Sequence, residues 1–253
     1  MESESGNVQV KAANAAAVGN VSAKAIQLTS TDGAVTAGAL TSKEGSITAE
    51  AGTTLTTTGK VHSADLAELT AKDAVKVSDV EAKEVQLTSS DITATDLKST
   101  ERSITAKART TLTTGTVDSA AVATLTAQEA LSVGKVTAKE IQLTSSEANV
   151  MAGDLTSTGG AITVKSGTEL KTGALTSQGG SIIANAGTSL TTTGKVNSAE
   201  AVTLTAQNDV VMDAAEAEGV ISVSSTSGNV SISGNLVSNK GSIGISGAQK
   251  VQA

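Results

Sequence analysis

The side chains that most often perform catalysis are sparse in this 253-residue chain. Its single histidine, His62, stands between Val61 and Ser63. One histidine cannot build a multi-histidine metal site, and we expect no catalytic triad around it. Serine and threonine are abundant, but a hydroxyl nucleophile needs an adjacent base, and lysine is the one plausible base here. We therefore interpret His62 as an outward surface residue.

Carboxylates are the second group of candidates, because paired acids cleave glycosidic bonds. Those in the first third of the chain are spread over expected corners and outward positions, where solvated charge is the ordinary interpretation. The chain has no Phe, Tyr or Trp, so it has no aromatic platform for a sugar beside such acids. We predict no catalytic residue and no enzymatic activity. The carboxylates considered are Asp32, Glu44, Glu50, Asp65, Glu68, Asp73 and Asp79.

Metal and cofactor motifs are also missing from the sequence. The absence of cysteine excludes disulfides and thiolate metal sites. Calcium-binding nonapeptide repeats need regularly spaced Gly-Gly-x-Gly-x-Asp corners. Gly159-Gly160 and Gly179-Gly180 are instead followed by Ala161 and Ser181. We therefore predict no metal site, no cofactor site and no bound cofactor.

The charge of the chain restricts its partners. A net charge of −7 argues against a nucleic-acid binder, whose surface would carry a basic stripe. The segment Met1–Ser5 is acidic and polar, without an apolar run. We expect neither a signal peptide nor membrane insertion.

The composition favours a narrow core extended along an axis. Aromatic residues, the usual fillers of a wide interior, are absent, so Val, Ile, Leu and Ala must form the core. The absence of proline suits long hydrogen-bonded ladders, because proline would remove an amide donor from each ladder. Glycine is expected to supply the tight corners.

Apolar residues alternate with polar ones in short pieces from Ile26 onward, which indicates strands with one buried face. Glycine or another turn residue separates these pieces, and three short strands make one turn. The pattern predicts an all-β, single-stranded parallel β-helix (solenoid) of about 12 turns, each of roughly 19–21 residues. The first strands of the turns are expected near Ile26, Ile47, Leu69, Val85, Ile104, Leu125, Ile141, Ile162, Ile182, Val202, Ile221 and Ile243.

A doubled phrase reveals the period. Leu155–Ile162 recurs twenty positions later as Leu175–Ile182. Larger blocks of three turns repeat as well, and the last block is longer by one turn. Such an insertion is tolerated where each repeat contacts only its neighbours. The expected inward column contains Ile47, Leu55, Val61, Ile104, Leu112, Val117, Ile162, Leu170, Leu175, Ile182, Leu190 and Val196.

Some segments fit the repeat less well. We expect residues 1–20 to form an N-terminal edge or capping segment and residues 21–253 to form the repeat domain. The Ala- and Glu-rich runs Ala12–Ala17 and Asp213–Glu218 are interpreted as a loop or a single helical turn.

The Gly-Gly-Ala-Ile-Thr and Gly-Ala-Leu-Thr-Ser-Gln-Gly-Gly-Ser-Ile phrases resemble the filamentous-haemagglutinin-type repeats of two-partner-secreted adhesins and contact-dependent inhibition proteins of Gram-negative bacteria. The resemblance extends from about Ile26 to Ile245, and Gly153–Val164 is similar to one family repeat. It implies a right-handed helix that forms the shaft of a secreted or cell-surface fibre. The family's secretion domain, with its Asn-Pro motifs, is absent because the chain has no proline.

Our prediction is therefore a structural shaft or spacer of a filamentous adhesin, which presents distal domains without catalysis. A host receptor or glycan is a possible partner, with no residues assigned to it. Open strand edges at the two ends predict end-to-end self-association. One alternative is an ice-binding solenoid that uses Thr-x-Thr pairs such as Thr54-Leu55-Thr56, although charged residues interrupt that column. An artificial repeat scaffold is another.

Overall fold

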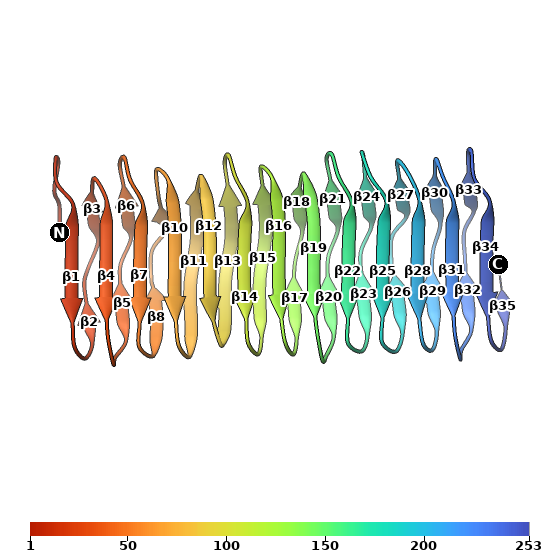
Figure 1. The fold of residues 1–253 in the computed structure, drawn as a ribbon, viewed down its shortest axis with the longest axis horizontal. Coiled ribbons are helices and arrows are strands. Elements are labelled where there is room, and N and C mark those ends of the chain that lie inside the picture. Colours follow the sequence, from red (N-terminus) through yellow and green to blue (C-terminus); the bar gives the residue numbers. More distant parts are fainter. Residues whose placement is uncertain (253) are drawn as a thin grey trace. The chain divides into compact units, whose positions relative to one another are not determined.

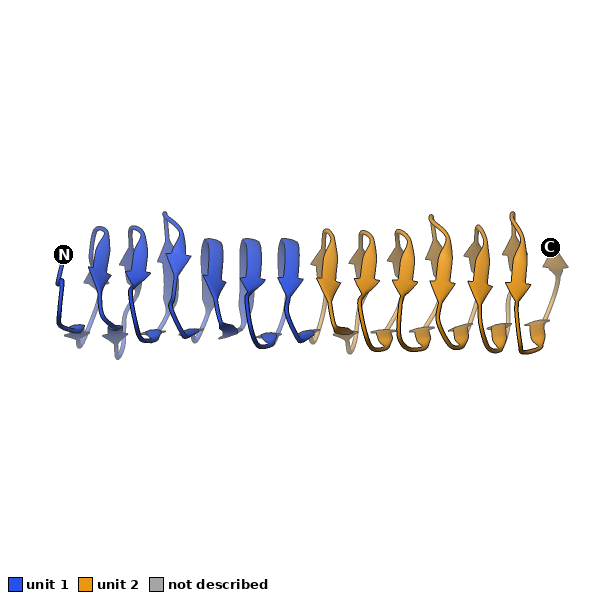
Figure 2. Cartoon of the chain, turned by 90° about the horizontal axis from the view of Figure 1, so that it is seen from above, with its two compact units in different colours: residues 1–126 blue, residues 127–253 orange. Residues whose placement is uncertain are grey.

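The computed structural model describes residues 1–252, and all of its regular elements are β-strands. The final residue of the expected 21–253 repeat domain, Ala253, lies outside the described residues. The chain divides into unit 1, Met1–Thr126, and unit 2, Ala127–Ala253, which Figure 2 colours blue and orange. In each unit the strands are parallel and stacked turn upon turn, so the fold is a β-solenoid, with about twelve turns along the chain.

Each turn contributes strands to three faces, which Figure 1 shows as successive arrows. Face 1 contains the first strand of every turn. In unit 1 these strands are β1 (Val8–Ala12), β4 (Ile26–Ser30), β7 (Ile47–Ala51), β10 (Leu66–Ala71), β12 (Glu84–Ser89), β14 (Ile104–Ala108) and β16 (Val122–Ala127). In unit 2 they are β19 (Glu140–Ser145), β22 (Ile162–Ser166), β25 (Ile182–Ala186), β28 (Val202–Ala206), β31 (Ile221–Ser225) and β34 (Ile243–Gly247).

Faces 2 and 3 contain the second and third strands of the turns. In unit 1 they are built from β2 (Ala16–Ala17), β3 (Val21–Ala23), β5 (Val35–Ala37), β6 (Leu40–Ser42), β8 (Thr54–Thr57), β9 (Val61–His62) and three long strands that serve both faces, β11 (Ala74–Ala82), β13 (Asp91–Ser99) and β15 (Leu112–Ser119).

In unit 2 the second and third strands are separate. Face 2 contains β17 (Leu131–Val133), β20 (Val150–Ala152), β23 (Leu170–Thr172), β26 (Leu190–Thr192), β29 (Val210–Met212), β32 (Val230–Ile232) and β35 (Val251–Gln252). Face 3 contains β18 (Val136–Ala138), β21 (Leu155–Ser157), β24 (Leu175–Ser177), β27 (Val196–Ser198), β30 (Ala215–Ala217) and β33 (Leu236–Ser238).

The predicted inward column is confirmed. All twelve of its residues are at most 1% exposed, and each stacks on an apolar residue of an adjacent turn. The doubled phrase shows the rule, because Leu155 pairs with Leu175 and Ile162 pairs with Ile182. Burial of one such side chain contributes on the order of 1.5 to 3 kcal/mol.

Two strand positions were predicted wrongly. Ala67, not Leu69, pairs with Ile47, and Ala123, not Leu125, pairs with Ile104. The leucines lie two positions further along the same inward face, and small alanines fill the expected positions. Some turns are also shorter than expected, since the step from Ala67 to its partner Val85 is shorter than the step from Ile162 to Ile182.

Each of the two alanine-rich segments, interpreted from the sequence as a loop or a helical turn, contains strand residues beside loop residues, and neither forms a helical turn. Ala12 ends β1, residues 13–15 connect the strands without regular structure, and Ala16–Ala17 form β2. Ala215–Ala217 form β30, which pairs with β27. Within the expected N-terminal segment, β1 pairs with β4 residue by residue from Val8–Ile26 to Ala12–Ser30. The ladder bonds to adjacent strands thus outweigh the helical propensity of alanine.

Glycine allows the corners for a reason that the sequence did not indicate. None of the glycines in residues 1–252 has a positive φ. The constraint is the close approach of successive turns: a Cβ on Gly180 would lie 2.7 Å from the backbone nitrogen of Ala161 and 2.7 Å from the carbonyl carbon of Gly160. The doubled Gly-Gly corners therefore let one turn lie directly on the next.

Candidate functional site

The residues that could do chemistry lie on the lateral faces of the solenoid. Strand alternation places every second side chain outward, and the parallel register aligns these side chains in columns that cross the turns. On face 3 of unit 1, Thr41 pairs with His62 and His62 pairs with Glu81. A hydroxyl, an imidazole and a carboxylate thus occupy consecutive turns, which is the residue set of a catalytic triad.

The geometry does not connect these three groups as a triad. His62 Nδ1 lies 3.9 Å from a Glu81 carboxylate oxygen, which is beyond hydrogen-bonding distance. Glu81 is also engaged by Lys60, and Lys98 Nζ lies 3.7 Å from its other oxygen. The hydroxyl next to His62 in sequence, Ser63, is turned inward and donates to the Leu66 carbonyl at 2.9 Å. The cluster of Lys60, His62, Glu81 and Lys98, which we name the Glu81 cluster, is thus an ion-pair network.

The cations around Glu81 affect the protonation of its carboxylate. The hydrogen bond from Lys60 is the main cause that lowers the pKa of Glu81 below its ordinary value, and the nearby charges of Lys60, Lys98 and His62 act in the same direction against partial burial. Glu81 therefore stays ionised down to more acidic pH than a free glutamate. An ionised, paired carboxylate is a poor general acid at neutral pH.

A second cluster joins three consecutive turns of unit 1. Arg102 Nη2 lies 2.8 Å from Asp65, and its Nη1 lies 3.1 Å from Glu84. These bonds to both carboxylates raise the pKa of Arg102. The three side chains are exposed enough for solvent to screen the pairs, so each pair contributes little to stability. Asp65, which is one of the carboxylates considered from the sequence, therefore has a cationic partner in Arg102.

The other carboxylates do not converge on a common site. Glu44 pairs with Lys24 at 2.7 Å on the exposed surface. Glu50 and Glu68 point outward from β7 and β10 on face 1, and Asp32, Asp73 and Asp79 lie at corners or outward positions. Within residues 1–252, no group of three or more His, Cys, Asp or Glu side chains is arranged to hold a metal ion.

Aspartates at several corners have a structural use that the sequence did not suggest. Asp96 accepts a hydrogen bond from the Thr116 amide at 2.8 Å and another from the Thr116 hydroxyl, one turn later. Asp154 accepts from the Ala174 amide at 2.8 Å in the same way. The hydrogen bonds from Thr116 lower the pKa of Asp96. These carboxylates link one turn to the next.

Inward serines at the corner after face 3 form a second inter-turn link. The Ser157 hydroxyl lies 2.7 Å from the carbonyl oxygens of both Lys139 and Gly160. The Ser177 hydroxyl repeats this geometry with Gly160 and Gly180, each at 2.7 Å. A buried hydroxyl that bonds the backbone in this way is not available as a nucleophile.

The Thr-x-Thr column considered for ice binding is interrupted. In unit 1, Lys76 pairs with Thr56, so a cation stands within the threonine column of face 2. In unit 2 the corresponding outward column contains Ser132, Met151, Lys171, Thr191, Val211 and Ser231. Charged and apolar side chains thus break the regular hydroxyl array in both units.

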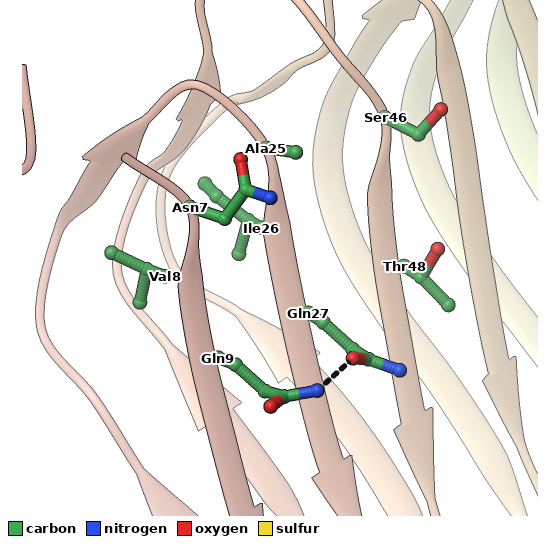
Figure 3. A pocket seen from close by; sticks show the side chains of 8 residues that line it. All are labelled: Asn7, Val8, Gln9, Ala25, Ile26, Gln27, Ser46 and Thr48. Atoms are coloured by element: carbon green, nitrogen blue, oxygen red, sulfur yellow. Dashed lines mark hydrogen bonds between the residues drawn. The ribbon is translucent and has the colours of Figure 1, made fainter. Parts of the chain in front are cut away.

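The surface hollows are open to solvent and lined by both polar and apolar residues. Figure 3 shows one on face 1 of unit 1, where Gln9, Gln27 and Thr48 project from β1, β4 and β7 over a volume of about 350 Å³. Gln9 donates a hydrogen bond to Gln27 there. None of the residues that line this hollow is ionisable. Another hollow, of about 320 Å³ in unit 2, presents Asn197, Glu216 and Asn239, and Lys195 already pairs with Glu216 at 2.6 Å.

Sequence reasoning missed Glu81, Glu84 and Arg102 as members of charged clusters. Glu81 lies in the turn that follows His62, with which it pairs in register. Arg102 reaches across two turns to Asp65, which is further from it in the sequence than its other carboxylate partner, Glu84. A spacing of about one turn between these charges was the signal for both clusters, but turns of unequal length obscured it.

No helix that is long and apolar enough to cross a membrane occurs in the part of the chain that the structure describes. Comparison with protein-family models, with curated proteins and with solved structures found no match to this chain.

Proposed function

We propose that this chain is a non-catalytic structural spacer, the shaft of a secreted or surface-exposed bacterial filamentous adhesin that holds distal domains away from the cell. The observation that carries the proposal is the doubled turn of unit 2. Residues 162–181 form one complete turn whose inward and outward residues align with those of the turns before and after it. A segment whose length changes by whole turns suits a spacer.

The lateral chemistry supports the same proposal. Outward side chains in the two units are mainly hydroxyls, amides and charged groups, and several of the charged groups pair with a neighbouring turn. Such faces keep a stack of sheets soluble and discourage lateral sheet pairing. The resemblance of Gly153–Val164 to filamentous-haemagglutinin-type repeats supplies the bacterial adhesin part of the proposal.

The mechanism is mechanical. Each inter-turn step is held by parallel backbone hydrogen bonds and by stacked aliphatic residues, and at several steps a corner serine such as Ser157 or Ser177 adds a further bond, so that load passes from one turn to the next. A host receptor or glycan can bind to the serine and threonine hydroxyls on the lateral faces without any change in the core. Such a partner belongs to the adhesin proposal and has no residues assigned to it.

Deletion of one turn tests the proposal. The chain has no cysteine, so spin labels can be placed at Gln142→Cys and Gly244→Cys, which are outward residues of one face 1 column in unit 2. Five strand steps separate them, through Thr163, Ile183, Thr203 and Ser222. At ~4.8 Å per step their backbones are about 24 Å apart.

We expect removal of residues 162–181 to shorten the distance between the labels by about 4.8 Å, measured by pulsed electron paramagnetic resonance. The circular dichroism spectrum and the thermal midpoint should stay close to those of the full chain. The matched control removes residues 162–171, which is half a turn and breaks the register. A chain that unfolds equally after either deletion would contradict the spacer proposal, and thermal hysteresis in the purified protein would favour ice binding instead.

A further inference from the structure

Face 3 of unit 2 has a hollow where one short side chain interrupts a column of long ones. The strands β24, β27, β30 and β33 lie side by side on this face (Figure 1), and the residues that follow them are, in order, Gln178, Ala199, Glu218 and Asn239. The Ala199 methyl group is too short to fill the space between Gln178 and Glu218. The resulting hollow, which we name the Asn197 hollow, has a volume of about 320 Å³.

Several polar groups of the Asn197 hollow have no partner in the chain. Thr176, Asn197 and Glu216 form the outward column beside it, one residue in each turn. Lys195 Nζ lies 2.6 Å from Glu216 Oε2, so the Oε1 atom of Glu216 is left over. Within residues 1–252, the side chains of Thr176, Asn197 and Gln178 form no hydrogen bond with another residue. The hollow therefore presents a hydroxyl, two amides and one carboxylate oxygen.

The charges that line the Asn197 hollow are balanced. Each of its two carboxylates has an ammonium group beside it: Glu216 pairs with Lys195, and Glu218 Oε2 lies 2.9 Å from Lys240 Nζ. The other oxygen of Glu218 accepts a hydrogen bond from the Asn239 amide at 2.8 Å. An ionic ligand thus gains little net attraction there, whereas a neutral ligand with hydroxyl groups finds both donors and acceptors.

Two further carboxylates lie in the same turns but outside the lining of the hollow. Glu200 accepts a hydrogen bond from the Ser181 hydroxyl at 3.0 Å, at the corner after β27. Asp213 accepts one from the Ser233 hydroxyl at 3.2 Å, at the corner before β30. Neither carboxylate joins Glu216 in a cluster, since no group of three or more acidic side chains is arranged for a metal ion within residues 1–252.

We propose that the Asn197 hollow binds a neutral glycan through its hydroxyl groups. The Asn197 amide both donates and accepts, as a sugar hydroxyl does, and the free Glu216 oxygen accepts a charge-assisted hydrogen bond. Asn197 and Glu216 pair in register, so their backbones are one strand step, ~4.8 Å, apart. That spacing suits neighbouring hydroxyls of one sugar. For the role of this ligand, the proposal rests on the adhesin function proposed above.

The same groups bind a glycan without cleaving it. Glu216 and Glu218 are two outward carboxylates of one strand, and a glycosidase would use such a pair with one member protonated as the acid. Hydrogen bonds from Lys240 and Asn239 lower the pKa of Glu218, so this group is ionised at neutral pH. Glu216 is held by Lys195 in an ion pair. The hollow is therefore a binding site without a general acid.

Titration of the full chain, followed by nuclear magnetic resonance of its side-chain amides, tests the proposal. The neutral probes are the disaccharides lactose, maltose, cellobiose and mannobiose, and the charged probes are sialyllactose and spermidine. Because the chain has no aromatic platform, we expect the best neutral probe to bind with a dissociation constant of about 1 mM. It should shift the amide signals of Asn197 and Gln178 but not that of Asn185, which is an outward residue of face 1.

Substitutions in the hollow should weaken this binding. Asn197→Ala removes the paired donor and acceptor, and Glu216→Gln removes the charge, so we expect each to weaken binding by about fivefold or more. Asn185→Ala and Glu169→Gln are the matched controls, because both sites are outward in unit 2 but lie away from the hollow, and they should leave the affinity unchanged. Unchanged circular dichroism spectra would show that the variants remain folded.

Three results would overturn the proposal. These are the absence of binding by every neutral probe, tighter binding of spermidine or sialyllactose than of any neutral probe, and binding that Asn197→Ala leaves unchanged. Release of monosaccharides from a bound probe would contradict the binding role. The spin-label distances that test the spacer are measured without a glycan, so failure of glycan binding and failure of the spacer proposal are separate results.

Discussion

The turns around Glu81 in unit 1 and the turns around Gly160 and Gly180 in unit 2 share an aliphatic interior but differ outside it. In unit 1, long strands such as β11 and β13 run through two faces, and ion pairs join successive turns. Around Gly160 and Gly180 in unit 2 the strands are short, the corners are Gly-Gly pairs, and the buried Ser157 and Ser177 donate to carbonyl oxygens of the preceding turn. The interior therefore defines the fold, and the lateral chemistry can vary.

The largest expected effect tests the shared interior. Leu55→Asp in unit 1 and Leu190→Asp in unit 2 each place an unpaired charge at a fully buried site. We expect both to reduce the free energy of unfolding by more than about 4 kcal/mol, measured by denaturant titration with circular dichroism. The outward neighbours provide controls, since Thr56→Asp and Thr191→Asp should change it by about 0.5 kcal/mol or less. A small effect in one unit alone would mean that the two interiors are not equivalent.

The next effect tests the corners of unit 2. Gly180→Ala places a methyl group against the backbone of the preceding turn, and we expect a loss of about 1 to 3 kcal/mol in the free energy of unfolding. Gly19→Ala is the matched control, because a Cβ there meets no atom within 4 Å. Equal thermal midpoints for the two variants would show that close approach does not explain the glycine corners.

Much of the fold could be predicted from the sequence, because inward alternation and the repeat period are both local patterns. The positions of Ala67 and Ala123 could not, since the larger leucines two positions later gave a stronger apolar signal. The cross-turn pairs of Glu81 and Arg102 were missed for another reason. Turns of unequal length, such as the short step from Ala67 to Val85, hide which charges become neighbours.

Acid should affect unit 1 through its carboxylate links. Hydrogen bonds from Thr110 and Thr111 lower the pKa of Asp91, and those from Thr116 lower the pKa of Asp96. Because both pKa values are below the ordinary 3.8, these groups contribute stability that is present above pH 3.8 and is lost as pH falls through the lowered values. Their contribution is therefore complete at pH 7.

The double variant Asp91→Asn, Asp96→Asn checks this pH dependence. The two introduced asparagine side chains stay neutral at every pH. We therefore expect the midpoint of denaturant unfolding of this variant to fall less between pH 7 and pH 2.5 than that of the unmodified chain. Glu218→Gln is the counterpart in unit 2, where the bonds from Lys240 and Asn239 lower the pKa of Glu218. Parallel pH curves for the double variant and the unmodified chain would mean that the aspartate links do not stabilise unit 1.

The smallest effect is a gain in stability. Thr57 in unit 1 and Thr192 in unit 2 have buried hydroxyls without a hydrogen-bond partner among the described residues. Replacement by valine keeps the shape and removes the desolvated hydroxyl, so we expect each change to add about 1 kcal/mol to the free energy of unfolding. Thr144→Val, at an outward site of unit 2, is the control. A loss of stability in Thr57→Val would reveal a partner for that hydroxyl.

Hydrogen exchange of the Leu55→Asp chain, resolved by segment with mass spectrometry, tests most directly the claim that the stability of each turn depends only on the adjacent turns. We predict that β5, β8 and β11, which contain Leu55 and its stacking partners, lose protection. The strands β22, β25 and β28 of unit 2 should keep the exchange rates of the unmodified chain. Equal loss of protection in all of these strands would show one cooperative unit and contradict a modular spacer.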